Sequence, residues 1–132
     1  QKAEEALLYL ATNSIEYRLH IKNSISEKEF ITPQYQRIFK EIIESEETNQ
    51  HFIATLTSEE DRLELTQILL KTEQESEEIV LKNQWKDCIL VLKQYKIDNR
   101  VKEIKELLKD SRIEESKGNE LLAELTGLIT GR

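Results

Sequence analysis

Histidine, cysteine and glycine, which zinc sites, thiol catalysis and phosphate-binding loops require, are scarce in this 132-residue chain: it has two histidines, one cysteine and three glycines. His20 and His51 lie 31 residues apart and have no cysteine partner, so they offer no ligand set for zinc. Cys88 falls among apolar residues at helical spacing, which predicts a buried thiol of low reactivity. The glycines all follow residue 117, so no glycine-rich phosphate loop is present. We therefore expect no catalytic residue, cofactor or metal in this chain.

Two clusters of charged residues are candidates for a ligand site. The run Glu59-Glu60-Asp61 could attract a cation, but the helix dipole favours acidic residues in a first turn, and this is the better explanation. Trp85 lies among Lys82, Lys86 and Lys93, a combination that would bind single-stranded nucleic acid by base stacking if the ring were exposed. We expect Trp85 to anchor the core instead, and nucleic-acid binding is kept as an alternative.

The charge of the chain argues against strong binding to nucleic acid. The formal net charge is −7, to which residues 1–81 contribute −9, residues 82–96 contribute +3 and residues 97–132 contribute −1. Because neutralisation of phosphates supplies most of the non-specific affinity, an acidic chain without a strongly basic face is a poor candidate for duplex binding. No apolar run approaches the ~20 residues of a membrane span, and the single cysteine suits the reducing cytoplasm, where we expect the protein to act.

A third candidate site is apolar and lies in the last third of the chain. We expect two helices there, which together carry more leucine and isoleucine side chains than one pairwise contact can bury. The excess is expected to bind a protein partner. The alternatives are that the two helices fold back onto the rest of the chain, or that two copies associate through them. The candidate partner-binding residues are Leu107, Leu108, Leu121, Leu122, Leu125, Leu128 and Ile129.

The first three helices are marked by the spacing of apolar residues and by capping residues. The first helix is expected over residues 3–11, and the second follows a cap at Asn13 or Ser14. The third begins at Pro33 with Thr32 as its N-cap, because proline at the first helical position loses no hydrogen bond. Its buried stripe is Tyr35, Ile38, Phe39, Ile42 and Ile43.

Two more helices are expected in the middle of the chain. A short one lies around residues 51–56, and the next begins after Thr57, because Thr57 and Glu60 match the capping-box pattern. Residues 72–78 are polar and acidic and are expected to form a loop. The inner face of the second of these helices is expected to consist of Leu63, Leu65, Ile68, Leu69 and Leu70.

A long helix follows, and its apolar stripe changes position near residues 95–99. The second stripe is displaced from the first by about 200° around the axis. Either the helix breaks near Asp98-Asn99, or it is continuous and buries opposite faces against different neighbours. The first stripe is Leu81, Trp85, Cys88, Leu92 and Tyr95, and the second is Ile97, Val101, Ile104 and Leu108.

The apolar spacing and the scarcity of helix breakers thus predict an all-α fold of three parts. A helical bundle occupies residues 1–81, a long connecting helix residues 82–96, and a C-terminal αα-hairpin residues 97–132. Residues 112–119 are expected to form the turn of the hairpin, with Gly118 as its permissive residue and Asn119 as the next N-cap. Since the chain starts at Gln1 and contains no methionine, we read it as a fragment of a larger polypeptide.

The stretch around Phe30 resembles a small helical module of bacterial DNA replication. Glu29-Phe30, Tyr35-Gln36 and Ile38-Phe39 match its acidic–aromatic pair, its aromatic or histidine position, and its Ile-Phe-like pair. Tyr35 stands where the family often has histidine. The module occurs in the helicase-binding C-terminal domain of bacterial DNA primase and in the N-terminal domain of the replicative hexameric helicase. The similarity covers residues 3–47 best, and the long helix and hairpin expected after them favour the primase domain.

This resemblance implies a docking role within the primosome. In a DNA primase of the Gram-positive type, the terminal hairpin would bind the N-terminal domains of the helicase ring, and the bundle would modulate both enzymes. The fragment itself would catalyse nothing, because primer synthesis would lie in another domain. It would act in the cytoplasm at the replication fork, as a monomer or as a species that associates weakly through the hairpin. The alternatives are the collar domain of the helicase itself and a helical nucleic-acid-binding module.

Overall fold

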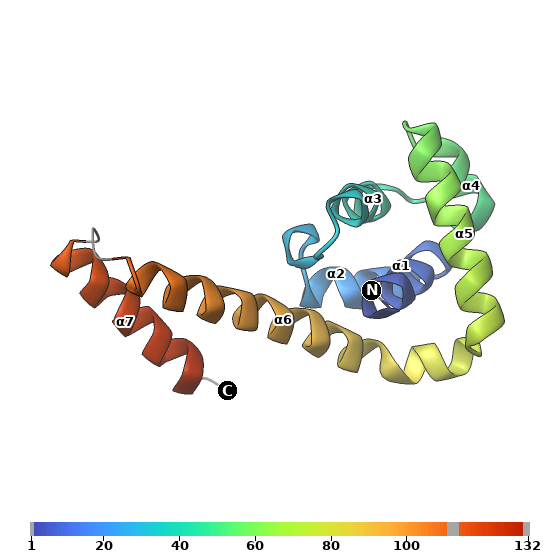
Figure 1. Ribbon diagram of the computed structural model, residues 1–132. Coiled ribbons are helices and arrows are strands. Elements are labelled where there is room, and N and C mark those ends of the chain that lie inside the picture. The colour runs from blue at the N-terminus through green and yellow to red at the C-terminus, as the bar shows by residue number, and fades with distance from the viewer. Residues whose placement is uncertain (1, 111–113, 131–132) are drawn as a thin grey trace. The chain divides into compact units, whose positions relative to one another are not determined.

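The computed structural model describes residues 2–110 and 114–130, and within these ranges the chain is all-helical (Figure 1). The predicted all-α class is confirmed, since the described residues contain no strand. None of their helices combines the length and the apolar character that crossing a membrane requires. The elements are α1 (Lys2–Asn13), α2 (Ile15–Ser24), the 3-10 helix η1 (Glu27–Glu29), α3 (Pro33–Glu44), α4 (Asn49–Thr55), α5 (Glu59–Glu75), α6 (Glu78–Leu108) and α7 (Glu115–Thr130).

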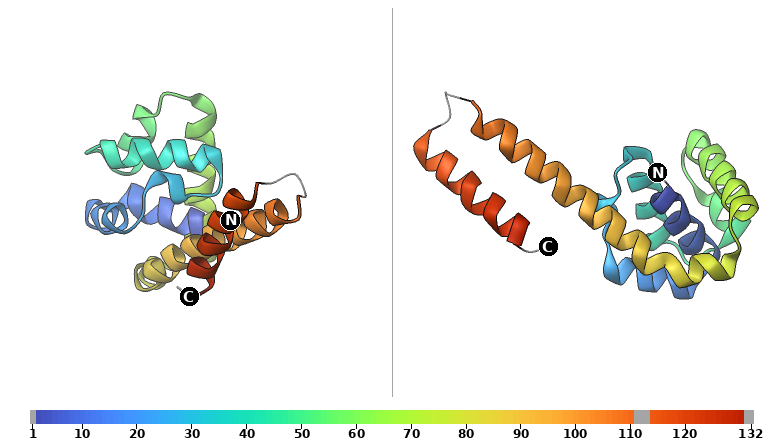
Figure 2. Two further views of the ribbon diagram at one scale, coloured as in Figure 1. Left: turned by 90° about the vertical axis from the view of Figure 1, so that its left-hand side faces the viewer. Right: turned by 60° about the horizontal axis from the view of Figure 1, so that its bottom comes forward.

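The chain forms two compact units, which divide between Leu92 and Lys93 inside α6. The first unit holds α1 to α5 and the first part of α6, and the second holds the rest of α6 and α7 (Figure 2). The division falls within the predicted connecting helix, residues 82–96. Helix α6 is continuous through Asp98-Asn99, so the displaced apolar stripe reflects a change of buried face and not a break.

Helix α1 is the centre of the first unit. It contacts α2, α3, α4 and α5, and every residue from Ala6 to Ala11 is buried. A helix that is apolar around most of its circumference must be enclosed by other elements to be stable in water. The neighbouring helices supply that enclosure, and Leu81, Ile89 and Leu92 of α6 join the same core.

Helix α3 packs onto α1 through the stripe that its sequence predicts. Tyr35, Ile38, Phe39 and Ile42 are buried, while Ile43 is half-buried. Phe30 comes just before the helix, is fully buried and stacks on Phe39, with 4.7 Å between the ring centroids. An offset aromatic pair of this kind adds about 1 kcal/mol to the free energy of burial. The stretch from Phe30 to Phe39 is therefore a structural part of the core.

The start of α3 is fixed by a carboxylate from α1 and not by its own cap. Thr32 occupies the N-cap position, but its side chain makes no capping hydrogen bond. Instead the Thr32 hydroxyl donates to Glu4 Oε1 at 3.1 Å. Glu4 Oε2 accepts from the backbone N–H groups of Ile31 and Thr32, at 2.8 and 3.0 Å. The Glu4 side chain is fully buried, so these hydrogen bonds replace those it would make with water.

A second buried charge, Arg18 of α2, joins the ends of two helices. Its guanidinium donates to Ala11 O at 2.8 Å and Thr12 O at 3.4 Å, near the end of α1. It also donates to Ser45 O at 2.8 Å and Glu47 O at 2.7 Å, just after α3. The last carbonyls of a helix lack partners within the helix and carry partial negative charge, which a guanidinium satisfies. Burial lowers the pKa of Arg18.

The start of α5 differs from the prediction by one residue. Ser58, and not Thr57, is the N-cap, and its side chain accepts from the backbone N–H of Asp61. Thr57 instead donates from its hydroxyl to Glu41 Oε1 at 3.0 Å. The loop predicted over residues 72–78 is confirmed only at residues 76 and 77, because α5 continues to Glu75 and α6 begins at Glu78.

The inner face of α5 is narrower than expected. Leu65 and Ile68 are buried and Leu69 packs against the core, but Leu63 and Leu70 are 61% and 56% exposed. At about 100° per residue, Leu63 and Leu70 lie on the side of the helix opposite Leu65, Ile68 and Leu69. Their prediction as inner residues was therefore wrong.

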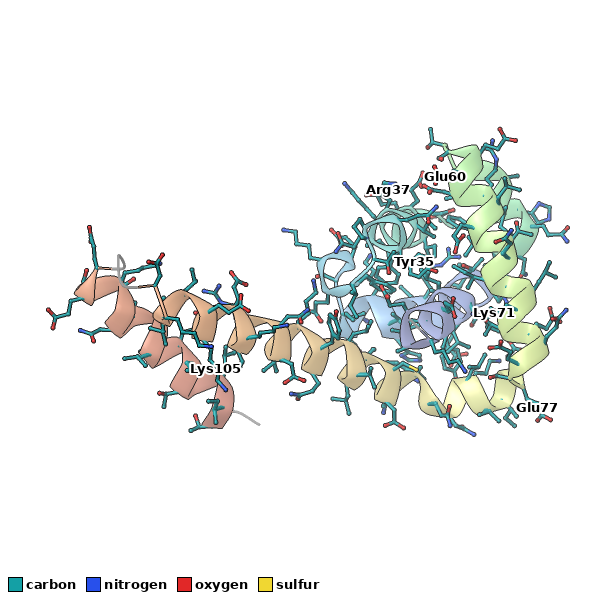
Figure 3. The ribbon with its side chains drawn as sticks, viewed as in Figure 1. Tyr35, Arg37, Glu60, Lys71, Glu77 and Lys105 are labelled. Atoms are coloured by element: carbon teal, nitrogen blue, oxygen red, sulfur yellow. The ribbon has the colours of Figure 1, made fainter. Side chains whose placement is uncertain are left out.

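Polar side chains of α3 make contacts with α5, and Figure 3 labels two of these side chains, Tyr35 and Arg37. The Tyr35 hydroxyl donates to Glu64 Oε1 at 3.1 Å, and burial together with Glu64 strongly raises the pKa of this phenol. Asp61 is only 2% exposed and accepts from Arg37 Nη2 at 2.9 Å and from Gln34 Nε2 at 3.0 Å. The acidic run at the start of α5 thus places one carboxylate in a structural ion pair.

Candidate protein-docking site

The seven candidate partner-binding residues lie in the second unit, on α7 and on the last turn of α6. Figures 1 and 2 show α7 running back alongside the end of α6. Leu121 is only 3% exposed, while Leu108, Leu125 and Leu128 are half-buried. The exposed members are Leu107 at 40%, Leu122 at 50% and Ile129 at 49%.

Helix geometry explains why α7 buries some of its leucines and exposes others. Leu121, Leu125 and Leu128 follow i, i+4, i+7 spacing and lie on one face. Val101 and Ile104 of α6 are buried in the same unit, and we infer that these side chains form the contact between the two helices. Leu122 and Ile129 are seven residues apart and lie about 90° from that face. They therefore remain exposed when the two helices pack.

The outer face of α7, comprising Leu122, Thr126, Ile129 and Thr130, is uncharged. The Thr126 hydroxyl donates to Leu122 O at 2.9 Å, and the Thr130 hydroxyl donates to Thr126 O at 2.8 Å. Both threonines therefore satisfy their hydroxyls within their own helix and leave their methyl groups available for contact. Between Leu121 and Thr130 the sole charged residue is Glu124. The result is an apolar surface that a partner can cover without desolvating a charge.

An ion pair joins α7 to α6. Arg100 Nε and Nη2 donate to the two carboxylate oxygens of Glu124 at 3.1 and 2.8 Å, a bidentate arrangement. Arg100 Nη1 also donates to Glu103 Oε1 at 2.9 Å. Hydrogen bonding to Glu124 raises the pKa of Arg100, and hydrogen bonding to Arg100 lowers that of Glu124. Exposed pairs contribute little stability, but this geometry holds Glu124 to one side of the outer face.

The turn expected before α7 is only partly within the described residues. Residues 111–113 lie outside them, and α7 begins at Glu115, so Gly118 and Asn119 belong to the helix. The Gly118 N–H donates to Glu114 O at 2.8 Å in the helical pattern, and its φ is not positive. The prediction of Asn119 as an N-cap was therefore wrong.

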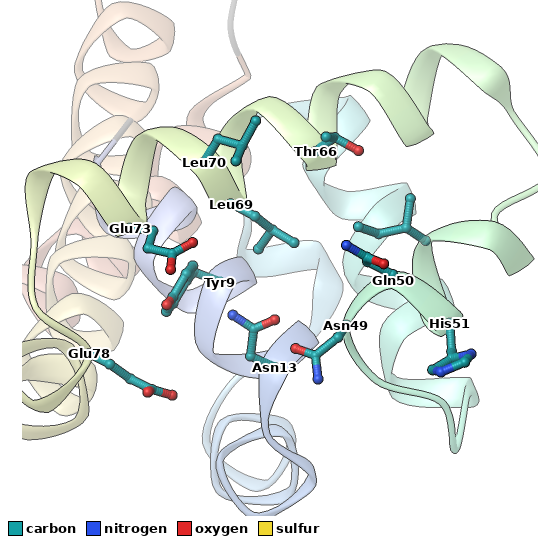
Figure 4. A pocket seen from close by; sticks show the side chains of 11 residues that line it. Tyr9, Asn13, Asn49, Gln50, His51, Thr66, Leu69, Leu70, Glu73 and Glu78 are labelled. Carbon is teal, nitrogen blue, oxygen red and sulfur yellow. The ribbon is translucent and has the colours of Figure 1, made fainter.

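The first unit has a polar hollow between α1, α4 and α5 (Figure 4). Asn13 of α1 and Asn49 of α4 face each other in it, and Asn49 has a left-handed backbone with φ of 53°, which asparagine tolerates better than most residues. Burial, Glu78 and Glu73 raise the pKa of Tyr9 at the inner wall. A phenol with a raised pKa is protonated at neutral pH, so Tyr9 can donate a hydrogen bond there but cannot act as a base.

The histidines and the cysteine do not assemble into a reactive group in the described part of the chain. No cluster of three or more potential metal ligands occurs there. His51 borders the polar hollow, whereas His20 stacks on Trp85. Cys88 is half-buried, and its pKa is raised by burial and by Asp87. Little of the nucleophilic thiolate is therefore present at neutral pH.

Trp85 is half-buried and belongs to an aromatic cluster between α2 and α6. The His20 ring stacks on it at 5.7 Å between centroids, and the Tyr17 ring meets it edge-on at 6.4 Å. Lys82 and Lys86 place their ammonium groups over the Tyr17 and Trp85 rings, at 5.4 and 5.6 Å. The His20 ring and the Lys86 ammonium group thus already cover the Trp85 indole, which leaves little of its face for stacking with a nucleic-acid base.

Comparisons of this chain with protein-family models, with curated proteins and with solved structures find no match. The features that bear on a docking role are therefore the resemblance of residues 3–47 and the geometry of α7. Sequence reasoning missed the buried charges Glu4 and Arg18 altogether, because their partners are distant in sequence.

Proposed function

We propose that this chain is the helicase-binding domain of a bacterial DNA primase, and that it docks on the N-terminal domains of the replicative hexameric helicase through α7. The observation that carries the proposal is the outer face of α7, where Leu122 and Ile129 are half exposed on a surface without charge. Exposed aliphatic pairs on a helix commonly insert into a groove between helices of a partner. In this proposal the chain catalyses nothing, and it acts in the cytoplasm at the replication fork.

Several features of the first unit support this assignment. The residues that carry the resemblance, Glu29-Phe30, Tyr35-Gln36 and Ile38-Phe39, belong to the buried core around α3 or to its edge. Helix α6 begins in the first unit, continues without a break into the second, and precedes α7, an order of elements that agrees with the plan of the primase domain. The first unit would modulate the helicase and the primase, and strong direct binding to nucleic acid is not part of the proposal.

The N-terminal collar domain of the replicative helicase is a second candidate. The observation that favours it is that the similarity over residues 3–47 fits this module equally well. As a collar, the chain would assemble into rings or dimers by itself. A primase domain would instead be a monomer, or associate weakly, until it meets the helicase.

Calorimetric titration of the helicase with this chain tests the proposal. The full chain is expected to bind, and a chain lacking residues 97–132 is expected to lose most of the affinity, because the outer face of α7 is removed. A helicase that binds both chains equally would contradict the assignment of α7 as the docking element. Circular dichroism of the shortened chain provides the control that its first unit is still folded.

A further inference from the structure

A second apolar surface lies in the first unit, in a groove between α2 and the end of α3. Ile15 and Leu19 of α2 line it with 42% and 51% of their surface exposed, opposite the half-buried Ile43 of α3. Ile15 and Leu19 are four residues apart, so they lie one above the other on the same side of α2. These three aliphatic side chains are the apolar lining of the groove and are called its apolar seat below.

A buried arginine holds the two sides of the groove together. Arg18 lies between Ile15 and Leu19 in the sequence, is 3% exposed, and donates to Ser45 O and Glu47 O beyond α3. These hydrogen bonds hold the segment after α3 against α2. The Ser14 side chain caps the start of α2 by accepting from Tyr17 N. A ligand would therefore find the groove already formed and would lose little affinity to ordering it.

The border of the groove is acidic. Glu44 and Glu46 line it, Lys22 is its one exposed cation, and Glu16 and Glu47 come next to it in the sequence. Neither Glu44 nor Glu46 has an ion-pair partner among the described residues. Residues 1–92 as a whole carry 10 Lys and Arg against 18 Asp and Glu, a formal net charge of −8.

We propose that this groove binds an amphipathic helical segment of another protein, whose apolar side chains are flanked by lysine or arginine. The apolar seat fits two or three aliphatic side chains at helical spacing, which is the helix-in-groove mode of recognition. The unpaired carboxylates at its border complement a basic flank, which speeds association and disfavours acidic competitors. A second copy of this chain is disfavoured as the occupant because its formal net charge of −7 is repelled by the acidic border of the groove.

The test is an NMR titration of the isotope-labelled 132-residue chain with two synthetic helical peptides. Both carry leucines at i, i+4 and i+7, and they differ only in lysine or glutamate at the flanking positions. The lysine peptide is expected to shift the amide signals of residues 15–22 and 43–46, and added salt should weaken its binding. The glutamate peptide is expected to bind at least about tenfold more weakly.

Matched variants distinguish binding of the peptide in the groove from non-specific electrostatic attraction to an acidic protein. Leu19→Ser is expected to lower the affinity for the lysine peptide about tenfold. Leu63→Ser, on the exposed side of α5, should leave that affinity unchanged. The proposal is overturned if both variants bind like the parent, if the shifts fall outside the groove, or if the glutamate peptide binds equally well. Sedimentation of the chain alone provides a further check, because self-association that Leu19→Ser abolishes would assign the groove to a second copy.

Discussion

Replacing Arg18 with methionine is expected to lower the free energy of unfolding of the first unit by about 3–5 kcal/mol. The Arg18 side chain is 3% exposed and donates to four backbone carbonyls from two different segments. Methionine has a similar length and fills most of the space, so the loss reports chiefly the carbonyls left without donors. Each buried polar group without a partner costs about 1–3 kcal/mol.

Two further variants distinguish the contribution of the Arg18 hydrogen-bond geometry to stability from the contribution of its positive charge. Arg18→Lys keeps the charge but cannot reproduce a planar fork of donors, so it should show most of the loss. Lys40→Met removes a cation from the exposed side of α3 and should change the stability by no more than about 0.5 kcal/mol. Urea-induced unfolding followed by circular dichroism measures all three. A loss below about 1 kcal/mol for Arg18→Met would show that the carbonyls find other donors.

The second large effect is expected on binding. Changing both Leu122 and Ile129 to serine should weaken binding to the N-terminal domains of the replicative helicase at least about 100-fold, because each buried anchor contributes about 2 kcal/mol. Both side chains are half exposed in the free chain, so its stability should change by less than about 1 kcal/mol. The variant therefore separates a docking role from a structural one.

A matched pair of leucines serves as the control for this binding experiment. Leu63 and Leu70 of α5 are also seven residues apart on one side of a helix, and they are slightly more exposed, at 61% and 56%. Changing both to serine should leave the affinity for the helicase unchanged in calorimetry. If the substitutions on α5 weaken binding as much as those on α7 do, the outer face of α7 is not the specific contact.

The sequence predicted the helical class and the core of α3 because both depend on local patterns. The buried stripe from Tyr35 to Ile42 repeats at helical spacing, and Pro33 marks the start of the helix. The mistaken prediction that Leu63 and Leu70 of α5 are buried could have been avoided from the sequence. At about 100° per residue, Leu65, Ile68 and Leu69 share one side of the helix, and Leu63 and Leu70 lie on the other. The number of leucines in a helix is thus a weaker guide to burial than their angular positions.

The buried charges could not be predicted from the sequence. Glu4 contacts residues 27 and 28 positions away, and Arg18 contacts Ser45 and Glu47, which are 27 and 29 positions away. Nothing in the residues beside Arg18 distinguishes it from a surface arginine, because its burial depends on where α3 ends. The groove that Arg18 supports is hidden from sequence reasoning for the same reason.

The extent of α7 shows how helix formation can override residues typical of turns. Gly118 and Asn119 favour a turn, but the good helix formers of residues 120–125 follow them directly, and α7 begins already at Glu115. A Cβ added at Gly118 or Gly127 would meet no heavy atom within 4 Å. Packing against the described residues therefore does not require either glycine.

The most direct test of the docking proposal is a mass measurement of the chain alone and with the replicative helicase, by size-exclusion chromatography with light scattering. We expect the chain by itself to elute at or near the 15.6 kDa mass of the monomer, and to join the helicase in one larger complex when the two are mixed. A chain that forms stable rings by itself would instead be the collar domain. A chain that elutes separately from the helicase at concentrations well above the expected Kd would contradict the proposal outright.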